Sequence, residues 1–408
     1  MDDDELIKKI LKNEVPLHKI EEYVDPEKAV SIRRKVIEKY ANVSLFNISK
    51  SNVEYDKILN KNIENVIGSI SMPLGVAGPI KINGEFASGN FYLPIATTEG
   101  ALVASISRGI KAINAAGGAN THIYRDGMAR SPVFEFNNAK KAREFIEWVN
   151  KNEEKISEYG DKTTSHGKIK NLNCFILGNN VWVRILMDTG DAMGMNMLTI
   201  ASEAIANYIE ENFEGAKLVS ISGNMCSDKK ESYVNELLGR GKGIVADCLI
   251  KKDILKKIFE VDAEKVNMLN IKKNLLGSSM AGSSKHNAHF ANVIAGIFAA
   301  TGQDLAQIVE SSSGYTWTEN RNGDLYISVT LPSLEVATVG GGTSMIQQKE
   351  VLSIMNIDFI NKNIGENSKK LAEMISGGVL SGELNLLCAL AKKELGSAHK
   401  KLGRDKKI

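Results

Sequence analysis

The chain has 408 residues, of which 43% are hydrophobic and 25% are charged, and its formal net charge is +2. These values are typical of a soluble globular protein with two or three domains. The nearly balanced charge argues against a nucleic-acid partner, and the lack of about 18 uninterrupted apolar residues argues against a membrane span.

Residues 1 to about 45 are predicted to form helices. Asp25 is a good N-cap and Pro26 suits the first helical position, so a helix is expected from there to about Tyr40. The acidic start of the segment is the reverse of a secretory signal, and we expect a cytoplasmic protein. Four widely spaced cysteines without a C-x-x-C pair predict neither a disulfide framework nor a zinc cluster.

A strand pair that turns at Asn83-Gly84 is predicted next, followed by a helix over 101–115. Glu99 lies at the junction between the second strand and this helix. Its carboxylate has two interpretations: a first-turn residue favoured by the helix dipole, or a catalytic acid.

Strands and helices alternate through residues 132–220, after a turn predicted at Asp126-Gly127. A helix is expected at 138–157, strands at 168–176 and 180–188, a helix at 195–213 and a strand at 217–221. This order is typical of a small α/β domain inserted into a larger one. The loop 191–197 and the turn 164–168 can bind phosphate groups, but they can equally be a helix-starting loop and a surface turn.

Asp228, Lys229 and Lys230 follow the last of these strands. Adjacent cations are usually solvated, but a lysine folded against the core would stabilise an oxyanion. The region after residue 232 is predicted to be helical.

The stretch 273–307 is predicted to hold a central buried helix, because apolar residues recur there at helical spacing. Polar residues are embedded in it, and each is either a paired core group or part of a site: Lys273, Asn274, Asn287, His289, Asn292 and Asp304. His286 and His289 have no third ligand at a metal-binding spacing, so no metal site is predicted.

Strands near 324–330, a glycine run at 340–342 and an apolar helix over 382–395 complete the predicted elements. His399 stands in the Lys-rich tail. It is either an inert surface histidine or a proton donor, since histidine titrates near neutral pH.

Nine motifs, in this order, resemble the 3-hydroxy-3-methylglutaryl-coenzyme A (HMG-CoA) reductase family: ENVIGSISMPLGVAGP (64–79), TTEGALVAS (97–105), DAMGMNM (191–197), SGNMCSDKK (222–230), GSSMAGS (277–283), NAHFAN (287–292), GQD (302–304), LPSLEVATVGGGT (331–343) and GELNLL (382–387). The GVAGP and DAMGMNM versions resemble the biosynthetic class that uses NADPH. With no membrane domain before these motifs, the chain is similar to the soluble archaeal members.

The resemblance implies an α+β fold. Its expected parts are an N-terminal helical segment (1–45), a large catalytic domain around the central helix (46–130 and 221–408) and an inserted, ferredoxin-like cofactor domain (131–220). The implied reaction is the two-step reduction of HMG-CoA to mevalonate with release of CoA. The site is expected between two subunits of a homodimer or of a dimer of dimers, with no nucleic acid or membrane as partner.

Four catalytic residues follow from the resemblance. Lys229 polarises the carbonyl and Glu99 donates a proton to its oxygen. Asp304 is expected as a buried carboxylate that tunes both, and His399 protonates the CoA thiolate.

Binding residues follow in the same way. The hydroxymethylglutaryl group is expected to meet Arg130, Ser222, Asp228, Lys230, Lys273 and Asn292. CoA is expected to meet Ser105 and Arg108. NADPH is expected at Asp191, Met193, Gly194, Met195 and Asn196, with its 2′-phosphate near Ser165, His166 and Lys168.

The chain departs from the family at Lys285-His286, where a glycine and an aromatic residue are usual, and at Asp405, where animal enzymes carry a phosphorylatable serine. Regulation by phosphorylation at that position is therefore not expected. Two rival functions stay open at this point: NAD-linked oxidation of mevalonate, and binding of a CoA thioester without turnover.

Overall fold

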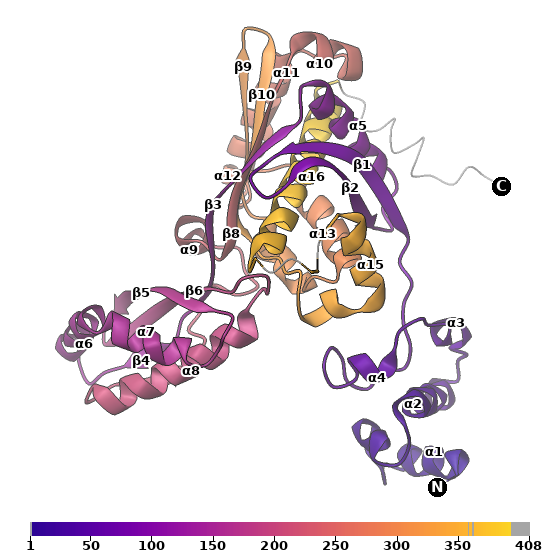
Figure 1. The fold of residues 1–408 in the computed structure, drawn as a ribbon, viewed down its shortest axis with the longest axis vertical. Helices are drawn as coiled ribbons and strands as arrows, with labels where there is room; N and C mark the ends of the chain where they lie inside the picture. The colour runs from indigo at the N-terminus through magenta and orange to yellow at the C-terminus, as the bar shows by residue number, and fades with distance from the viewer. Residues whose placement is uncertain (1, 358, 361–362, 393–408) are drawn as a thin grey trace.

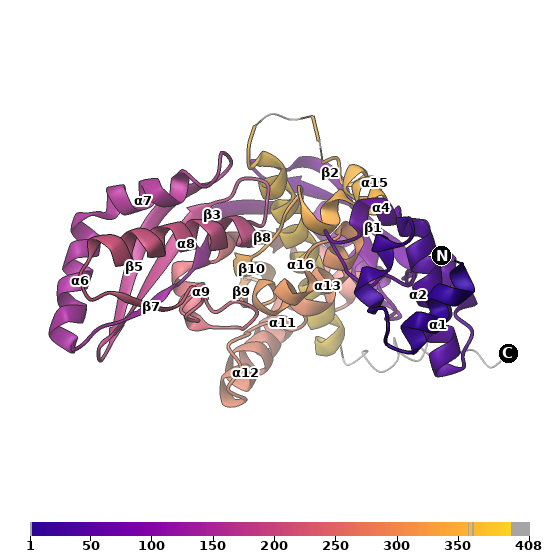
Figure 2. The same cartoon turned by 90° about the horizontal axis from the view of Figure 1, so that it is seen from below.

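The structure is a computed structural model that describes residues 2–357, 359–360 and 363–392 (Figure 1). Helices and strands are mixed along the chain. Figures 1 and 2 show helices α1–α4 and strands β4–β7 on opposite sides of the part that holds the long helix α16.

The N-terminal segment is helical, as predicted, and packs its apolar side chains into a small core of its own. Asp25 accepts a hydrogen bond from the Lys28 N–H and Pro26 opens the second helix, which confirms the predicted helix start. The elements are α1 (Asp3–Leu11), η1 (Leu17–Glu22), α2 (Pro26–Ala41), α3 (Phe46–Ser49) and α4 (Tyr55–Ile58).

Strand β3 (Ala119–Arg130) joins the two parts of the sheet. Its first two thirds pair with β8 (Gly241–Ile250), and its last three residues pair with β6 (Asn180–Asp188). The turn predicted at Asp126-Gly127 is wrong, because both residues pair with β8 inside this strand. The described strands follow the order β7-β4-β6-β3-β8-β10-β9, with β1 on β2 and β3, and β5 on β6.

The larger part of the sheet contains two strands that the sequence did not reveal. β8 and β9 (Tyr315–Arg321) both pair with β10 (Asp324–Leu334). The helical region predicted after residue 232 is in fact the short α9 (Tyr233–Leu238) followed by β8. A short apolar run between two neighbouring strands cannot be distinguished from a buried helix by its periodicity. β1 (Leu74–Asn83) and β2 (Ser88–Ala96) form the predicted strand pair.

Helix α16 (Glu366–Ala391) runs through the middle of the large core (Figure 1). It begins well before Gly382, where the sequence predicted the helix to start. By length and composition α16 is able to cross a membrane, but 78% of its most apolar window is buried inside the protein, as in the core helix of a soluble protein.

The predicted central helix is present but shorter than expected. α13 (Phe290–Thr301) is largely buried, whereas residues 283–289 are irregular. Glu383 of α16 accepts the N–H groups of Ala288 and His289, at 2.9 and 2.7 Å, and so holds this approach in place. Lys273 belongs to a separate π-helix, η2 (Ile271–Gly277).

Further helices surround this core. α5 (Leu102–Ala115) crosses α16 so closely that a Cβ on Gly109 would overlap the Ser381 carbonyl. The others are α10 (Lys252–Phe259), α11 (Ala263–Asn270), α12 (Ser278–Met280), η3 (Leu305–Gln307), α14 (Ile308–Ser311), η4 (Gly341–Ser344) and α15 (Ile346–Ile354).

The smaller part has the order β4 (Val133–Glu135), α6 (Ala139–Lys151), α7 (Glu153–Asp161), β5 (Lys168–Leu177), β6, α8 (Met195–Asn212), β7 (Lys217–Ser220) and a hydrophobic core of its own. The sequence predicted one helix where the structure has two, α6 and α7. Asn152 separates them, and its side chain donates a hydrogen bond to the Trp148 carbonyl. The segment leaves and rejoins the larger part at one place, where the Gly223 N–H donates to the Ser131 carbonyl at 2.7 Å.

Candidate active site

The lysine loop, residues 222–230, connects β7 to α9 and is held by buried side chains. Arg184 Nε donates to the Met225 carbonyl at 3.2 Å, and Asn235 Nδ2 donates to the Ser227 carbonyl at 3.3 Å. Lys229 has a φ of +59°, and its N–H donates to Glu310 Oε1 at 2.5 Å. Its side chain is 55% exposed, so the ammonium group is left accessible.

The segment that follows α13 packs against this loop. Gly302 ends α13 with a φ of +70°, and Asp304 then caps η3 by accepting the Ala306 N–H at 3.0 Å. Gln307 Nε2 donates to Asp228 Oδ1 at 3.2 Å. Asp304 is therefore carried by the same short segment that contacts Asp228 and Lys229.

Asp304 is exposed in the single chain, so its predicted burial is wrong there. The prediction rested on its position at the end of a core helix. The left-handed Gly302 instead turns the chain towards the surface, and the carboxylate is used as a cap.

Glu99 and Asn292, both predicted site residues, are in contact. Asn292 Nδ2 lies 3.1 Å from Glu99 Oε2 and 3.4 Å from Oε1. Glu99 is exposed in the turn between β2 and α5, where its N–H donates to Thr97 Oγ1 at 3.0 Å.

The predicted catalytic residues thus form two groups in a single chain, which we name half-sites. The acid half-site is Glu99 with Asn292, in the first turn of α13; the lysine half-site is Asp228, Lys229 and Asp304, beyond its last turn. The 12 residues of α13 span about 18 Å. Within one chain, the predicted contact of Asp304 with both Glu99 and Lys229 is therefore not formed.

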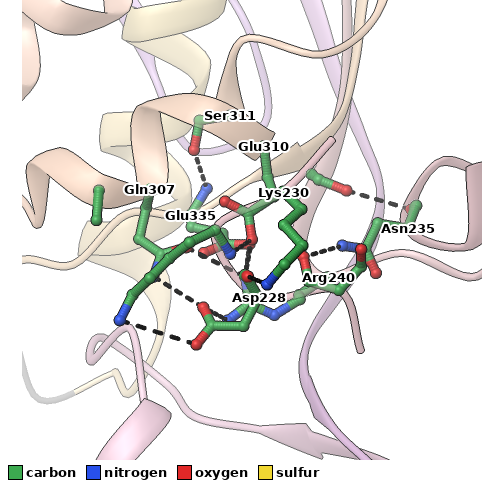
Figure 3. Close-up of polar contacts among 12 residues, drawn as sticks. Asp228, Lys230, Asn235, Arg240, Gln307, Glu310, Ser311 and Glu335 are labelled. Carbon is green, nitrogen blue, oxygen red and sulfur yellow. Dashed lines mark hydrogen bonds and ion pairs between the residues drawn. The ribbon is translucent and has the colours of Figure 1, made fainter. Parts of the chain in front are cut away.

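A buried acidic cluster around Arg240 adjoins the lysine loop through Asp228 (Figure 3). The Arg240 guanidinium is fully buried; its Nη2 lies 2.8 Å from Asp228 Oδ1 and its Nη1 lies 2.6 Å from Glu310 Oε1. Nη1 also pairs with Glu335, which is buried as well. We define the acidic cluster as Arg240, Asp228, Glu310 and Glu335.

The carboxyl groups of the cluster differ in their pKa. Burial raises the pKa of Glu335 well above its ordinary value; Arg240 opposes this rise, whereas the charges of Glu310 and Asp228 add to it. Burial also raises the pKa of Glu310, against the effects of Arg240 and the Lys229 N–H. For Asp228, burial is outweighed by Arg240, Gln307 and neighbouring cations, so its pKa falls below the ordinary value. The pKa of Asp228 is thus shifted in the opposite direction from the pKa values of Glu310 and Glu335.

Sequence reasoning missed Arg240, Gln307, Glu310 and Glu335. One signal was available: Glu335 stands between Leu334 and Val336 in a run of buried apolar residues. An acid in such a run needs a buried partner, and Arg240 supplies it. Nothing in the local sequence marks Glu310 in the same way.

Other predicted substrate residues divide into two groups. Arg130 Nη1 lies 3.6 Å from Asp228 Oδ2, and Lys230 Nζ lies 3.2 Å from the Asp228 carbonyl, so both belong beside the lysine half-site together with Ser222 of the same loop. Lys273 Nζ contacts only its neighbour Asn274, at 3.1 Å, among the hydrogen bonds of the described residues.

The two residues predicted to meet CoA lie on α5. Ser105 accepts a hydrogen bond from Asn385 Nδ2 at 2.7 Å. Arg108 donates to the Ile258 carbonyl at 2.8 Å and covers the Phe259 ring.

The loop predicted to bind the cofactor begins α8. Gly194, with a φ of +92°, precedes the helix and has no side chain to cap it, so the first N–H groups of α8 are open to an anion. Met193 and Met195 pack against the core of the smaller part, and Asn196 is exposed. Asp191 instead accepts the N–H groups of Gly365 and Ser368, at 2.9 and 2.8 Å, and caps α16.

The turn with Ser165, His166 and Lys168 lies beside this loop. A Cβ on Gly167 would overlap the Met197 side chain, so the turn packs against the first turn of α8. Ser165 Oγ lies 2.9 Å from His166 Nδ1. The hydroxyl, imidazole and ammonium groups next to an open helix N-terminus fit a phosphorylated ligand. His399 lies outside the described residues.

Comparison with known proteins gives a consistent match. The profile of the family described as hydroxymethylglutaryl-coenzyme A reductase matches residues 29–404. Curated 3-hydroxy-3-methylglutaryl-coenzyme A reductases are 48% identical in Pyrococcus abyssi, over 99% of this chain and 100% of that protein, and 47% identical in Aeropyrum pernix, over 98% and 96%. A class II 3-hydroxy-3-methylglutaryl-CoA reductase from Streptococcus pneumoniae, solved bound to NADPH in open conformations, has a TM-score of 0.67 at 20% identity and covers 92% of this chain and 100% of that one.

Proposed function

Because the chain belongs to the hydroxymethylglutaryl-coenzyme A reductase family, we propose that it reduces HMG-CoA to mevalonate in two NADPH-dependent steps, with release of CoA. The observation that supports this most directly is the packing of the lysine loop against the segment that carries Asp304. This packing places the accessible ammonium group of Lys229 and the carboxylate of Asp304 on adjoining segments.

The lysine half-site suits the electrophilic end of the substrate. Lys229 stabilises the negative charge that develops on the carbonyl oxygen in both reductions. Arg130 and Lys230 add cations that suit the free carboxylate of the hydroxymethylglutaryl group, and Asp228 keeps these cations oriented.

The acid half-site supplies the proton. Glu99 protonates the carbonyl oxygen, and Asn292 holds its carboxyl group by hydrogen bonding. Asp304 acts on both groups once the half-sites meet. His399 protonates the CoA thiolate, which would otherwise add back to the aldehyde.

The residues around α8 fit NADPH. The open N-terminus of α8 binds the pyrophosphate, and Ser165, His166 and Lys168 bind the 2′-phosphate. The cofactor's chemistry is hydride donation, once in each reduction. This arrangement favours NADPH over NADH.

We further propose that the active enzyme is a homodimer or a dimer of dimers, in which the acid half-site of one subunit meets the lysine half-site of the next. An exposed apolar strip that leads into β1 supports this proposal, since such strips are buried at interfaces. Ile70 is 91% exposed, and Met72, Leu74 and Val76 are exposed as well. A two-fold axis generates two complete sites from two chains.

For the architecture we propose residues 1–45 as an N-terminal helical segment, 46–130 and 221–408 as the large domain, and 131–220 as the inserted ferredoxin-like cofactor domain. Two separate cores and the β-α-α-β-β-α-β order of the insert, which is the ferredoxin-like order with its first helix divided into α6 and α7, support the division. We infer a cytoplasmic location, which suits the four free cysteines.

The test is the stoichiometry of the purified chain with HMG-CoA. Two NADPH should be oxidised for each CoA thiol released, and NADH should be a poorer reductant. A ratio of one, or no thiol release, contradicts the proposed reaction. Binding of the thioester without turnover, or faster mevalonate oxidation with NAD, identifies one of the two rival functions instead.

A further inference from the structure

Glu310 has a position that the proposed chemistry leaves unexplained. It is an acid on the short helix α14, 1% exposed, immediately after the segment that carries Asp304. Burying a carboxyl group is unfavourable unless strong partners compensate for the lost water. Its partners therefore indicate what it does.

All the hydrogen bonds recorded for the Glu310 carboxylate within the described residues go through Oε1. This oxygen accepts from Arg240 Nη1 at 2.6 Å and from the Lys229 backbone N–H at 2.5 Å. Arg240 is itself held by the buried Glu335, which lies outside the lysine loop, and it also pairs with Asp228 of that loop. Glu310 is thus held by Arg240 (Figure 3) and in turn holds the backbone of Lys229.

The backbone of Lys229 needs such an anchor. Its φ of +59° is a left-handed conformation that is unfavourable for a residue with a side chain. Ser227, two residues earlier, is also left-handed, with a φ of +48°. A glycine would relieve this strain, but the proposed reaction needs the lysine side chain. The conformation persists because the surroundings fix it.

We propose that Glu310 is a positioning residue, which accepts the Lys229 N–H and thereby sets the direction of the Lys229 ammonium group towards the substrate carbonyl. This role rests on the proposed reductase function, in which Lys229 stabilises the developing oxyanion. Because α14 follows the turn capped by Asp304, the same anchor keeps Asp304 and Lys229 in register with each other.

The kinetic test uses Glu310→Ala and Glu310→Gln. Alanine removes the acceptor, and we expect kcat to fall about tenfold or more, with KM within about threefold, since a misplaced ammonium group acts mainly in the transition state. Glutamine keeps an acceptor oxygen and should recover part of kcat. Glu373→Gln is the matched control: this buried glutamate accepts three backbone N–H groups at the β1–β2 turn, away from both half-sites, and its variant should keep kcat.

A second measurement does not depend on catalysis. Hydrogen exchange of the Lys229 amide should become at least about tenfold faster in Glu310→Ala and change less in Glu310→Gln, because exchange reports the opening of this hydrogen bond. Unchanged exchange in the alanine variant overturns the proposal, and so does faster exchange with an unchanged kcat.

The two tests separate the possible failures. If the wild type oxidises no NADPH with HMG-CoA, the proposed function fails, while the exchange of the Lys229 amide still shows whether Glu310 holds the loop. If Glu310→Ala does not fold, the Glu310→Gln variant decides through its kcat and the exchange rate of its Lys229 amide. At matched stability, a kcat in Glu310→Gln that is no lower than in Glu373→Gln counts against the proposal.

Discussion

Lys229 combines a fixed backbone with an accessible side chain. Its N–H is bound inside the protein, whereas more than half of its side chain faces solvent. A lysine used as an electrophilic group needs both properties, because an ammonium group that wanders loses the advantage of preorganisation. The environment of the residue, and not its type alone, therefore suits it to the proposed role.

The role proposed for His399 can be isolated with one substitution. His399→Gln should slow reduction of HMG-CoA by about tenfold or more but should leave reduction of free mevaldehyde nearly unchanged, because only the first reaction expels a thiolate. The measurement is NADPH oxidation with each substrate at saturation. Equal losses with both substrates would assign the histidine a different role.

Glu335 should make stability depend on pH. Its pKa is raised in the folded protein, so its contribution to stability is complete below the ordinary glutamate pKa, about 4.3, and is lost as the pH rises towards the raised value. Denaturant unfolding of the wild type and Glu335→Gln at fixed protein concentration measures this contribution. The free energy of unfolding of the wild type should fall relative to the variant as the pH rises above the ordinary glutamate pKa.

A control shows whether this trend belongs to the buried acid. Glu214 is exposed, and Glu214→Gln should differ from the wild type by a constant amount over the same pH range. A constant difference for Glu335→Gln as well would mean that Glu335 does not titrate as described.

At the residue scale, the sequence predicted groups whose chemistry is visible in a motif. Glu99 with Asn292, and Arg130 with Asp228, were predicted as site residues and are indeed in contact. Glu310 was not predicted, because its role depends on a backbone N–H that lies far away in sequence and near it only after folding. The roles assigned to the site residues stay predictions.

At the scale of elements, helix α16 is tied to the cofactor loop. The carboxylate of Asp191, in this loop, accepts two N–H groups at the start of α16. In addition, Ser368 Oγ of α16 donates to the Gly190 carbonyl at 2.9 Å. An acid at a helix N-terminus satisfies open N–H groups and complements the helix dipole. The loop predicted to hold NADPH thus also fixes the main core helix.

Asp191→Ala should destabilise the protein even when no NADPH is present. We expect a loss of about 1–2 kcal/mol in the free energy of unfolding, since two capping hydrogen bonds disappear. Asn196→Ala is the matched control in the same loop: Asn196 is exposed, and its loss should change stability by less than about 0.5 kcal/mol. Equal stability of the two variants would show that Asp191 is not a structural cap.

Elements with clear turn signals at their ends were predicted well. β5, β6, α8 and β7 begin and end within about a residue or two of the expected positions, because glycines mark the turn between β5 and β6 and the start of α8. The first half of α16 and the strand β8 were missed for another reason. Both are buried on all sides, so their sequences carry no amphipathic pattern.

At the scale of the whole molecule, the separation of the half-sites by α13 has a direct test. A mixture of Glu99→Gln and Lys229→Ala chains, unfolded together and refolded, should regain about one quarter of the wild-type activity, although each variant alone is nearly inactive. Half of the dimers are then mixed, and each mixed dimer has one intact pair of half-sites. No recovery in a mixture that forms mixed dimers would place both half-sites of one active site in the same chain.

The contact between the Gly223 N–H and the Ser131 carbonyl has a consequence for the history of the chain. Because the segment between these residues begins and ends at one point, substitutions inside it can change its ligand preference without redirecting the backbone on either side. Arg184 and Asp191 are the exceptions, because they hold the lysine loop and cap α16.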